Sequence, residues 1–162
     1  MHKKDIILKK YIRIFTSWRF YFFAIWKLPM VFITRIRVAK LTHKESVVTV
    51  PYNYLNKNPF RSTYFAVQAM GAELSTGVLV LMHVDGYNIS TLVTKLNSKY
   101  FKKATTKVNF ICLDGEKIIQ HVQRAIDSGE GVIFDLKSKG YDLDGLCVSE
   151  FDITWSLKLR KR

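Results

Sequence analysis

The sequence has few cysteines and none of the short motifs that mark the common nucleotide and hydrolase sites. Its two cysteines, Cys112 and Cys147, are too few for a disulfide framework or a four-ligand zinc site, and we expect both to be reduced core residues. P-loop, GxGxxG and GxSxG motifs are absent. His43, His83 and His121 lack the spacing of metal ligands. The sequence therefore predicts no metal site, no cofactor and a cytoplasmic protein.

Acidic residues are scarce at the start of the chain, so most of the net charge of +13 lies in this part of the sequence. Residues 1–44 hold eleven Lys and Arg against one acid, whereas residues 45–162 carry a net charge of only +3. A nucleic-acid-binding domain would spread a basic stripe over its folded surface. We therefore expect no nucleic-acid partner, and we treat residues 1–30 as a basic helical segment that precedes a domain at 31–162.

Residues 1–30 are also the most aromatic part of the chain, with eight aromatic side chains between Tyr11 and Trp26. The longest uncharged run, 20–26, is far shorter than the roughly 20 residues that span a bilayer, and no signal-peptide cleavage site follows it. Two interpretations remain open. The segment is either a terminal helix that caps the domain core, or a basic amphipathic helix that makes peripheral contact with the inner membrane surface.

Residues 62–84 form the longest apolar stretch, and their single formal charge is Glu73. Small residues recur through it, and Ser62 or Thr63 could cap its start, so we expect a helix buried on most sides. A transmembrane helix is the competing interpretation, which Gln68 and Glu73 near its middle disfavour. A lone carboxylate in an apolar helix must find a partner, become protonated or face a cavity. Glu73 is therefore either a site residue or one paired with a backbone amide, a Tyr or a Lys across a dimer interface.

Period-two alternation predicts the strands around this helix. Short strands are expected at 33–38 and 46–50, followed by a loop at 52–61 that is rich in Asn. Beyond the helix, strands are expected at 92–97, 108–112, 132–136 and 150–159, with a helix at 118–126 that stops at Gly129 and a hairpin turn at Asp144-Gly145. A long apolar helix followed by strands suits an α+β domain in which an antiparallel sheet curls around that helix.

The stretch NPFRSTYFAVQAMGAELSTG at 58–77 resembles the central-helix region of hotdog-fold thioesterases. That family has an Asn or Asp in a loop, a His-Gly-Gly six residues later, and an acid in the helix four residues before a Gly. The matching positions here are Asn58, Tyr64-Phe65-Ala66, Glu73 and Gly77. The likeness extends over 34–160 and points to a thioesterase-like branch whose function is unknown.

The resemblance implies a homodimer or tetramer, a site in the groove between protomers, and acyl-CoA or a related acyl thioester as substrate. Glu73 would be the base or the nucleophile, and Asn58 would orient the loop or a water molecule. Amides near Tyr64 and Phe65 would hold the carbonyl oxygen. Coenzyme A phosphates would meet basic side chains, for which the candidates are Arg61, Lys99, Lys102 and Lys103.

This chain departs from the family pattern at the start of the helix. Phe65 and Ala66 replace the two glycines, which places side chains where a thioester would approach the backbone. Tyr64 replaces the His and, with a reference pKa of about 10, cannot carry protons near neutral pH. A non-catalytic binder of acyl-CoA, fatty acid or lipid is therefore one alternative to an enzyme. The other is a membrane-surface scaffold in which residues 1–30 carry the function.

Overall fold

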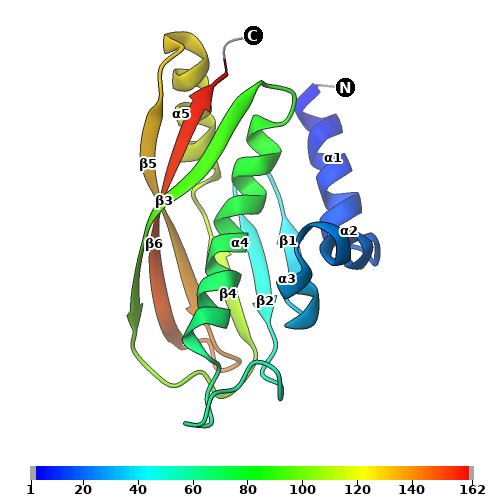
Figure 1. Ribbon diagram of the computed structural model, residues 1–162, viewed down its shortest axis with the longest axis vertical. Coiled ribbons are helices and arrows are strands. Elements are labelled where there is room, and N and C mark those ends of the chain that lie inside the picture. Colours follow the sequence, from blue (N-terminus) through cyan, green and yellow to red (C-terminus); the bar gives the residue numbers. More distant parts are fainter. Residues whose placement is uncertain (1–2, 161–162) are drawn as a thin grey trace.

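Six antiparallel strands form one curved sheet, in a computed structural model that describes residues 3–160 (Figure 1). Inward-facing residues of each central strand are buried and alternate with more exposed ones, which confirms the period-two interpretation. The strand order is β1-β2-β4-β5-β6-β3. The strands are β1 (Arg37–Leu41), β2 (Ser46–Val50), β3 (Ile89–Tyr100), β4 (Val108–Cys112), β5 (Val132–Tyr141) and β6 (Cys147–Leu159).

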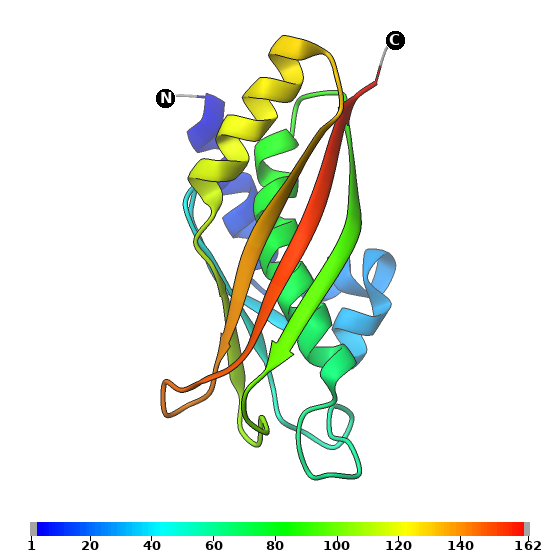
Figure 2. The same ribbon diagram turned by 90° about the vertical axis from the view of Figure 1, so that its left-hand side faces the viewer.

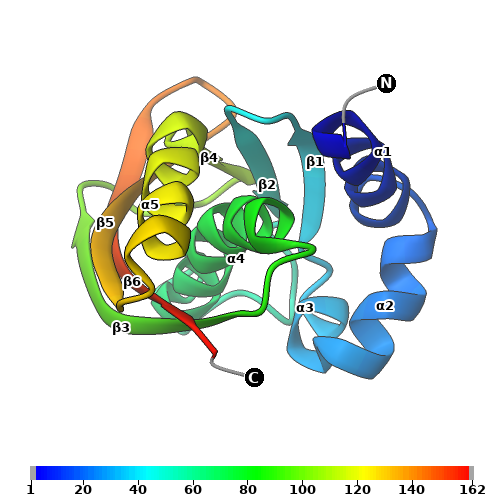
Figure 3. The ribbon, with the colours of Figure 1, turned by 90° about the horizontal axis from the view of Figure 1, so that it is seen from above.

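The predicted apolar helix is α4 (Phe65–Val84), and the sheet curls around it (Figures 2 and 3). Thirteen of its twenty residues are buried. By length and composition α4 could cross a membrane, but its burial against the sheet makes it the core helix of an α+β domain. The predicted cap is wrong: α4 begins at Phe65 after Tyr64, with no side-chain cap, and Ser62 and Thr63 lie in the preceding loop, where Thr63 N bonds Ala104 O at 2.7 Å.

The closest approach of α4 to the sheet is at Gly71. A Cβ added there would lie 2.4 Å from Cγ2 of Val50 and 2.8 Å from Cδ2 of Phe110, and both side chains are fully buried. Because neither neighbour can move away, we expect Gly71→Ala to lower the free energy of unfolding by about 1–3 kcal/mol. Urea denaturation measures this change.

Gly77 on the same helix is the matched control. A Cβ there would meet only the Glu73 carboxylate at 3.2 Å and the Trp155 ring at 3.5 Å. Because alanine favours the helix over glycine by up to about 1 kcal/mol, we expect Gly77→Ala to be neutral or mildly stabilising. Equal destabilisation by the two substitutions would contradict this view of the packing.

The basic segment forms three helices instead of one, α1 (Lys3–Phe15), α2 (Arg19–Lys27) and α3 (Pro29–Ile33), on the β1 side of the sheet (Figure 3). Pro29 starts α3 because its fixed φ suits the first helical turn. The strand expected at 33–38 is therefore wrong at its start, and β1 begins at Arg37. Phe15, Phe20 and Val31 are buried in the same core as α4, so this segment caps the core.

The remaining elements agree with the sequence, although β3, β5 and β6 are longer than predicted. Helix α5 (Gly115–Ser128) ends at Gly129, whose φ of 69° is the left-handed value typical of a helix stop. Gly145 turns the chain between β5 and β6 with a φ of 77°. Cys112 is buried on β4, and burial raises the pKa of its thiol to about 12. Cys147 is also free but only half-buried, so Cys112 alone lies in the core.

Candidate functional site

The loop before α4 is organised by the side-chain oxygen of Asn58. This Oδ1 accepts hydrogen bonds from Phe60 N at 3.0 Å and from both the amide and the hydroxyl of Ser62 at 3.2 Å. The chain then turns through Arg61, which has a positive φ of 59°. Within residues 3–160 the Nδ2 of Asn58 has no hydrogen-bond partner. Asn58 therefore fixes the loop with one end of its amide and leaves the other end free to donate.

Removing this acceptor should weaken the fold. We expect Asn58→Ala to lower the free energy of unfolding by about 1–2 kcal/mol, because a net contribution near 1 kcal/mol is typical of a hydrogen bond. Asn58→Asp keeps an acceptor at the same place and should be less destabilised. Urea denaturation of both variants tests this, and an Asn58→Ala protein as stable as the wild type would contradict it.

A cavity of about 350 Å³ lies between this loop, the start of α4 and the segment that follows β3. Its volume is at the lower end of the range for small-molecule sites. The structure brings together four of the residues singled out in the sequence at this cavity, Asn58, Phe65, Lys102 and Lys103. Tyr64, Arg61, Lys99, Ala66 and Glu73 are not part of its lining.

The start of α4 presents unpaired backbone donors beside this cavity. Tyr64 N bonds Asn56 O at 2.7 Å, and the amides of Val67 and Gln68 bond Tyr64 O. The amides of Phe65 and Ala66 have no acceptor among the residues that the structure describes. Because the positive end of the helix dipole lies at the same place, these two N–H groups are suited to hold a carbonyl oxygen or an oxyanion.

Gln68 and Tyr100 are among the cavity residues that were not selected as site residues from the sequence. Gln68 is buried, where its Nε2 donates to Thr63 O at 3.2 Å and its Oε1 accepts from the Ser149 hydroxyl at 2.9 Å. The Tyr100 hydroxyl reaches Phe65 O at 3.4 Å. Gln68 carried a signal, since it is a polar residue one turn into an apolar helix, whereas no pattern connected Tyr100 with the start of α4.

Glu73 lies two turns further along α4 and is half-buried. Its carboxylate has no hydrogen bond or ion pair to any residue in the described range 3–160. Burial raises the pKa of this carboxyl above its ordinary value. The carboxylate lies over Gly77 beside the ring of Trp155, whose Nε1 donates to Thr76 Oγ1 at 3.1 Å. Among the side chains that the structure describes, therefore, no partner neutralises Glu73.

Within one chain, Glu73 lies far from the free amides of Phe65 and Ala66. Eight residues separate it from Phe65, which amounts to about 12 Å along the helix axis. A reacting carbonyl would have to lie within about 3 Å of both groups. The acid and the donors of one protomer cannot therefore act on the same thioester.

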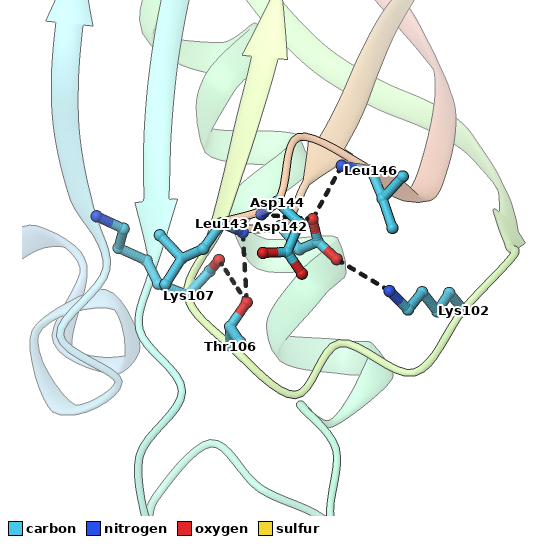
Figure 4. Close-up of polar contacts among 7 residues, drawn as sticks. All are labelled: Lys102, Thr106, Lys107, Asp142, Leu143, Asp144 and Leu146. Carbon is cyan, nitrogen blue, oxygen red and sulfur yellow. Dashed lines mark hydrogen bonds and ion pairs between the residues drawn. The ribbon is translucent and has the colours of Figure 1, made fainter.

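The four basic candidates are in different surroundings. Lys102 points at Asp142 in the turn between β5 and β6, with its Nζ 3.5 Å from the carboxylate (Figure 4). The backbone amide of Leu146 leads the interactions that hold the pKa of Asp142 below its usual range. Lys103 lines the cavity and has no ion pair among residues 3–160.

The other two cations lie away from the cavity lining. Arg61 is exposed at the loop tip. Lys99 is paired in register with Glu150, which bonds the outward-facing Lys137, so Lys99 lies on the sheet face opposite α4. Among residues 3–160, no group of three or more His, Cys, Asp or Glu side chains could hold a metal ion.

Solved structures of similar fold come from several bacteria. A Pseudomonas aeruginosa protein of unknown function, described as a probable thioesterase, is 19% identical, has a TM-score of 0.75, and is matched over 98% of this chain and 97% of its own. A Haemophilus influenzae thioesterase is 11% identical with a TM-score of 0.66, over 89% and 92% of the two chains. A Staphylococcus aureus thioesterase, solved as a Gln→Ala variant, is 11% identical with a TM-score of 0.64, over 80% and 98%.

These likenesses confirm the hotdog fold expected from the resemblance at 58–77. No curated protein matches the sequence. The family model named DUF4442, a domain of unknown function, matches residues 16–157 and thus includes α2, α3 and the sheet except for the last two residues of β6. The chain belongs to the DUF4442 family and has the hotdog fold of its thioesterase neighbours.

Proposed function

We propose that the protein hydrolyses acyl thioesters, with acyl-CoA as the expected form of the substrate. The observation that carries the proposal is a half-buried carboxylate without a partner, Glu73, on the same helix whose first amides, at Phe65 and Ala66, are unpaired. A carboxylate and an oxyanion site are the two groups that thioester hydrolysis needs.

A further coincidence supports these roles. Two solved structures of one Staphylococcus aureus protein carry single alanine substitutions, one of a Gln and one of a Glu, at positions fifteen residues apart. One of their titles names the protein a thioesterase. Asn58 and Glu73 have the same separation in this chain. We propose that Asn58 takes the place of the amide side chain and Glu73 that of the acid.

In the proposed reaction, the Phe65 and Ala66 amides hold the thioester oxygen while a water molecule attacks the carbonyl carbon. Glu73 takes the proton from that water, and the negative charge that develops on the oxygen is stabilised by the amides. The carbon–sulfur bond then breaks, and the thiolate takes up a proton. The products are a carboxylic acid and a free thiol. Direct attack by the Glu73 carboxylate would instead pass through an acyl-enzyme that water hydrolyses.

The proposed site is completed by a second copy of the chain, because about 12 Å of helix axis separates Glu73 from the free amides within one chain. Strand β3 is the exposed edge for such a dimer: it is twelve residues long, and Leu92 and Leu96 lie exposed on it. A long apolar edge strand is a template for pairing with another chain. We therefore propose a homodimer in which β3 pairs antiparallel with the partner's β3.

This pairing would bring the two halves of the site together. Val93 is opposite Trp155 in the register of β3 and β6, and Trp155 adjoins Glu73, so Glu73 lies under the first half of β3. Tyr100, at the last residue of β3, contacts Phe65. A two-fold axis between antiparallel strands sets the end of one beside the beginning of the other. The partner's Phe65 would then approach Glu73.

Hydrolysis of acyl-CoAs of graded chain length tests the proposal. Release of coenzyme A, measured with a chromogenic thiol reagent, should depend on enzyme concentration and show a preferred chain length. Lys103, which lines the cavity without an ion pair, is our candidate for a coenzyme A phosphate contact. Lys103→Ala should then raise KM more than it lowers kcat. Wild-type protein that is inert at every chain length would overturn the hydrolase proposal.

Non-catalytic acyl binding is the second candidate, and the ring of Phe65 favours it. Phe65 stacks edge-on with Tyr64 and Tyr100 at the start of α4, where the thioesterase pattern has glycine. If the rings close the approach to the amides, a bound acyl chain would persist without turnover. Native mass spectrometry of the purified protein would then detect a stoichiometric acyl ligand in a protein that releases no thiol.

A further inference from the structure

The outer side of α2 and α3 exposes large apolar side chains that the core does not use. Phe20 and Ala24 face the core, whereas Trp18, Phe22 and Trp26 are 65%, 60% and 83% exposed at the spacing of one helix face. Helix α2 lies on the outer flank of the molecule (Figure 3). We call the exposed set the α2–α3 patch, which comprises Trp18, Phe22, Ile25, Trp26, Met30, Phe32 and Ile33.

The segment that contains this patch is rich in cations and has no acids near it in the sequence. No Asp or Glu occurs between residues 6 and 44, which contain nine Lys and Arg. Three of the nine form ion pairs with acids elsewhere in the chain. Within residues 3–160, no acid pairs with Arg13, Arg19, Lys27, Arg35 or Arg37. Arg19 lies 5.7 Å from the Trp18 ring, so positive charge borders the apolar surface directly.

We propose that the α2–α3 patch docks on an anionic lipid surface. Tryptophan and phenylalanine enter the boundary between headgroups and acyl chains, while Lys and Arg beside them attract anionic headgroups. A second copy of the chain is a poorer occupant, because a two-fold contact would place the unpaired cations of both copies face to face. The positive charge beside the α2–α3 patch therefore favours a negatively charged partner, and the exposed apolar side chains of the patch favour a membrane.

The patch is also connected to the loop of the candidate site. The buried Asn56 donates from Nδ2 to Thr34 O, at the end of α3, at 2.8 Å, and its backbone oxygen accepts from Tyr64 N at 2.7 Å. One residue thus joins the last turn of α3 to the start of α4. Docking would hold the loop that contains Asn58 close to the lipid surface.

Vesicle flotation of the full chain tests this proposal. We expect binding to phosphatidylcholine vesicles that contain about 30% phosphatidylserine, weaker binding at high salt, and little binding to pure phosphatidylcholine. The double substitution Phe22→Ser and Trp26→Ser should reduce binding about tenfold or more. Replacing Arg19 or Lys27 with Gln should reduce it about fivefold each.

The matched control replaces two equally exposed apolar residues elsewhere. Leu113 and Ile133, each 67% exposed, should tolerate Ser without loss of vesicle binding. Circular dichroism verifies that all variants are folded. The proposal would be overturned if the wild-type protein did not bind anionic vesicles. It would also be overturned if the control variant at Leu113 and Ile133 lost as much binding as the patch variant. A patch variant that changes only the number of subunits would also overturn it, in favour of a protein interface. None of these outcomes depends on thioester hydrolysis.

Discussion

Glu73→Gln should abolish thioester hydrolysis, with a loss of about 100- to 10,000-fold in kcat. The amide is nearly the same size as the carboxylate but cannot accept the proton from water or attack the substrate. Because burial holds the pKa of Glu73 above its ordinary value of 4.5, the wild-type enzyme should lose kcat/KM as the pH falls through this raised pKa. Any activity that remains in the Glu73→Gln variant should no longer fall in this acidic pH range.

The same substitution should stabilise the protein, which distinguishes a lost reacting group from a damaged fold. Ionised Glu73 is disfavoured in the folded state, so the contribution of Glu73 to stability should be greatest below pH 4.5 and should fall as the pH rises through the raised pKa. Glu73→Gln removes this penalty. We expect a higher Tm than wild type at pH 7 and nearly the same Tm at pH 4. A lower Tm of the variant at pH 7 would contradict the unpartnered carboxylate.

Phe65→Pro should lower kcat by about 100- to 1000-fold, the usual effect of removing one oxyanion donor. Phe65 is the first residue of α4, a position that proline favours, and Tyr64 before it is already extended with a ψ of 134°. The substitution therefore deletes one unpaired N–H group and leaves the helix intact. Kinetics with acyl-CoA and a thermal melt measure the two effects separately.

Phe65→Ala is the matched control for this prediction. It removes the same aromatic ring but keeps the N–H group, so its kcat should stay close to that of the wild type. Equal losses in Phe65→Pro and Phe65→Ala would show that the ring matters and that the amide does not. That result would remove the proposed oxyanion site.

Local chemistry made much of this fold predictable from the sequence. The apolar run at 62–84 with one acid identified α4, and alternation identified β2 and β4 to the residue. The single helix expected at 1–30 failed because the helix is interrupted at 16–18 and again at Leu28, after which Pro29 begins α3. The cap at Ser62 or Thr63 failed because contacts with distant segments hold the chain in a loop up to Tyr64: Thr63 N bonds Ala104 O and Tyr64 N bonds Asn56 O.

The candidate site was predictable only in part, for a physical reason. The resemblance at 58–77 pointed to Asn58 and Glu73, and Glu73 also stood out as the lone charge of an apolar run. The fold places Phe65 and Lys103 beside the same cavity as Asn58. The positions of the other residues, such as Lys99 and Tyr100, depend on pairing between distant segments. Lys99 lies on the opposite sheet face because of its register with Glu150, and Tyr100 reaches α4 through the length of β3.

The most direct measurement of the shared site mixes two inactive chains. Co-expression of differently tagged Glu73→Gln and Phe65→Pro chains allows the mixed dimer to be purified apart from both parents. One of its two sites would combine the intact Phe65 amide of the first chain with the intact Glu73 of the second. We predict about half of the wild-type activity in the mixed dimer and almost none in either parent. A mixed dimer as inactive as both parents, or a chain that stays monomeric, would contradict a site built by two copies.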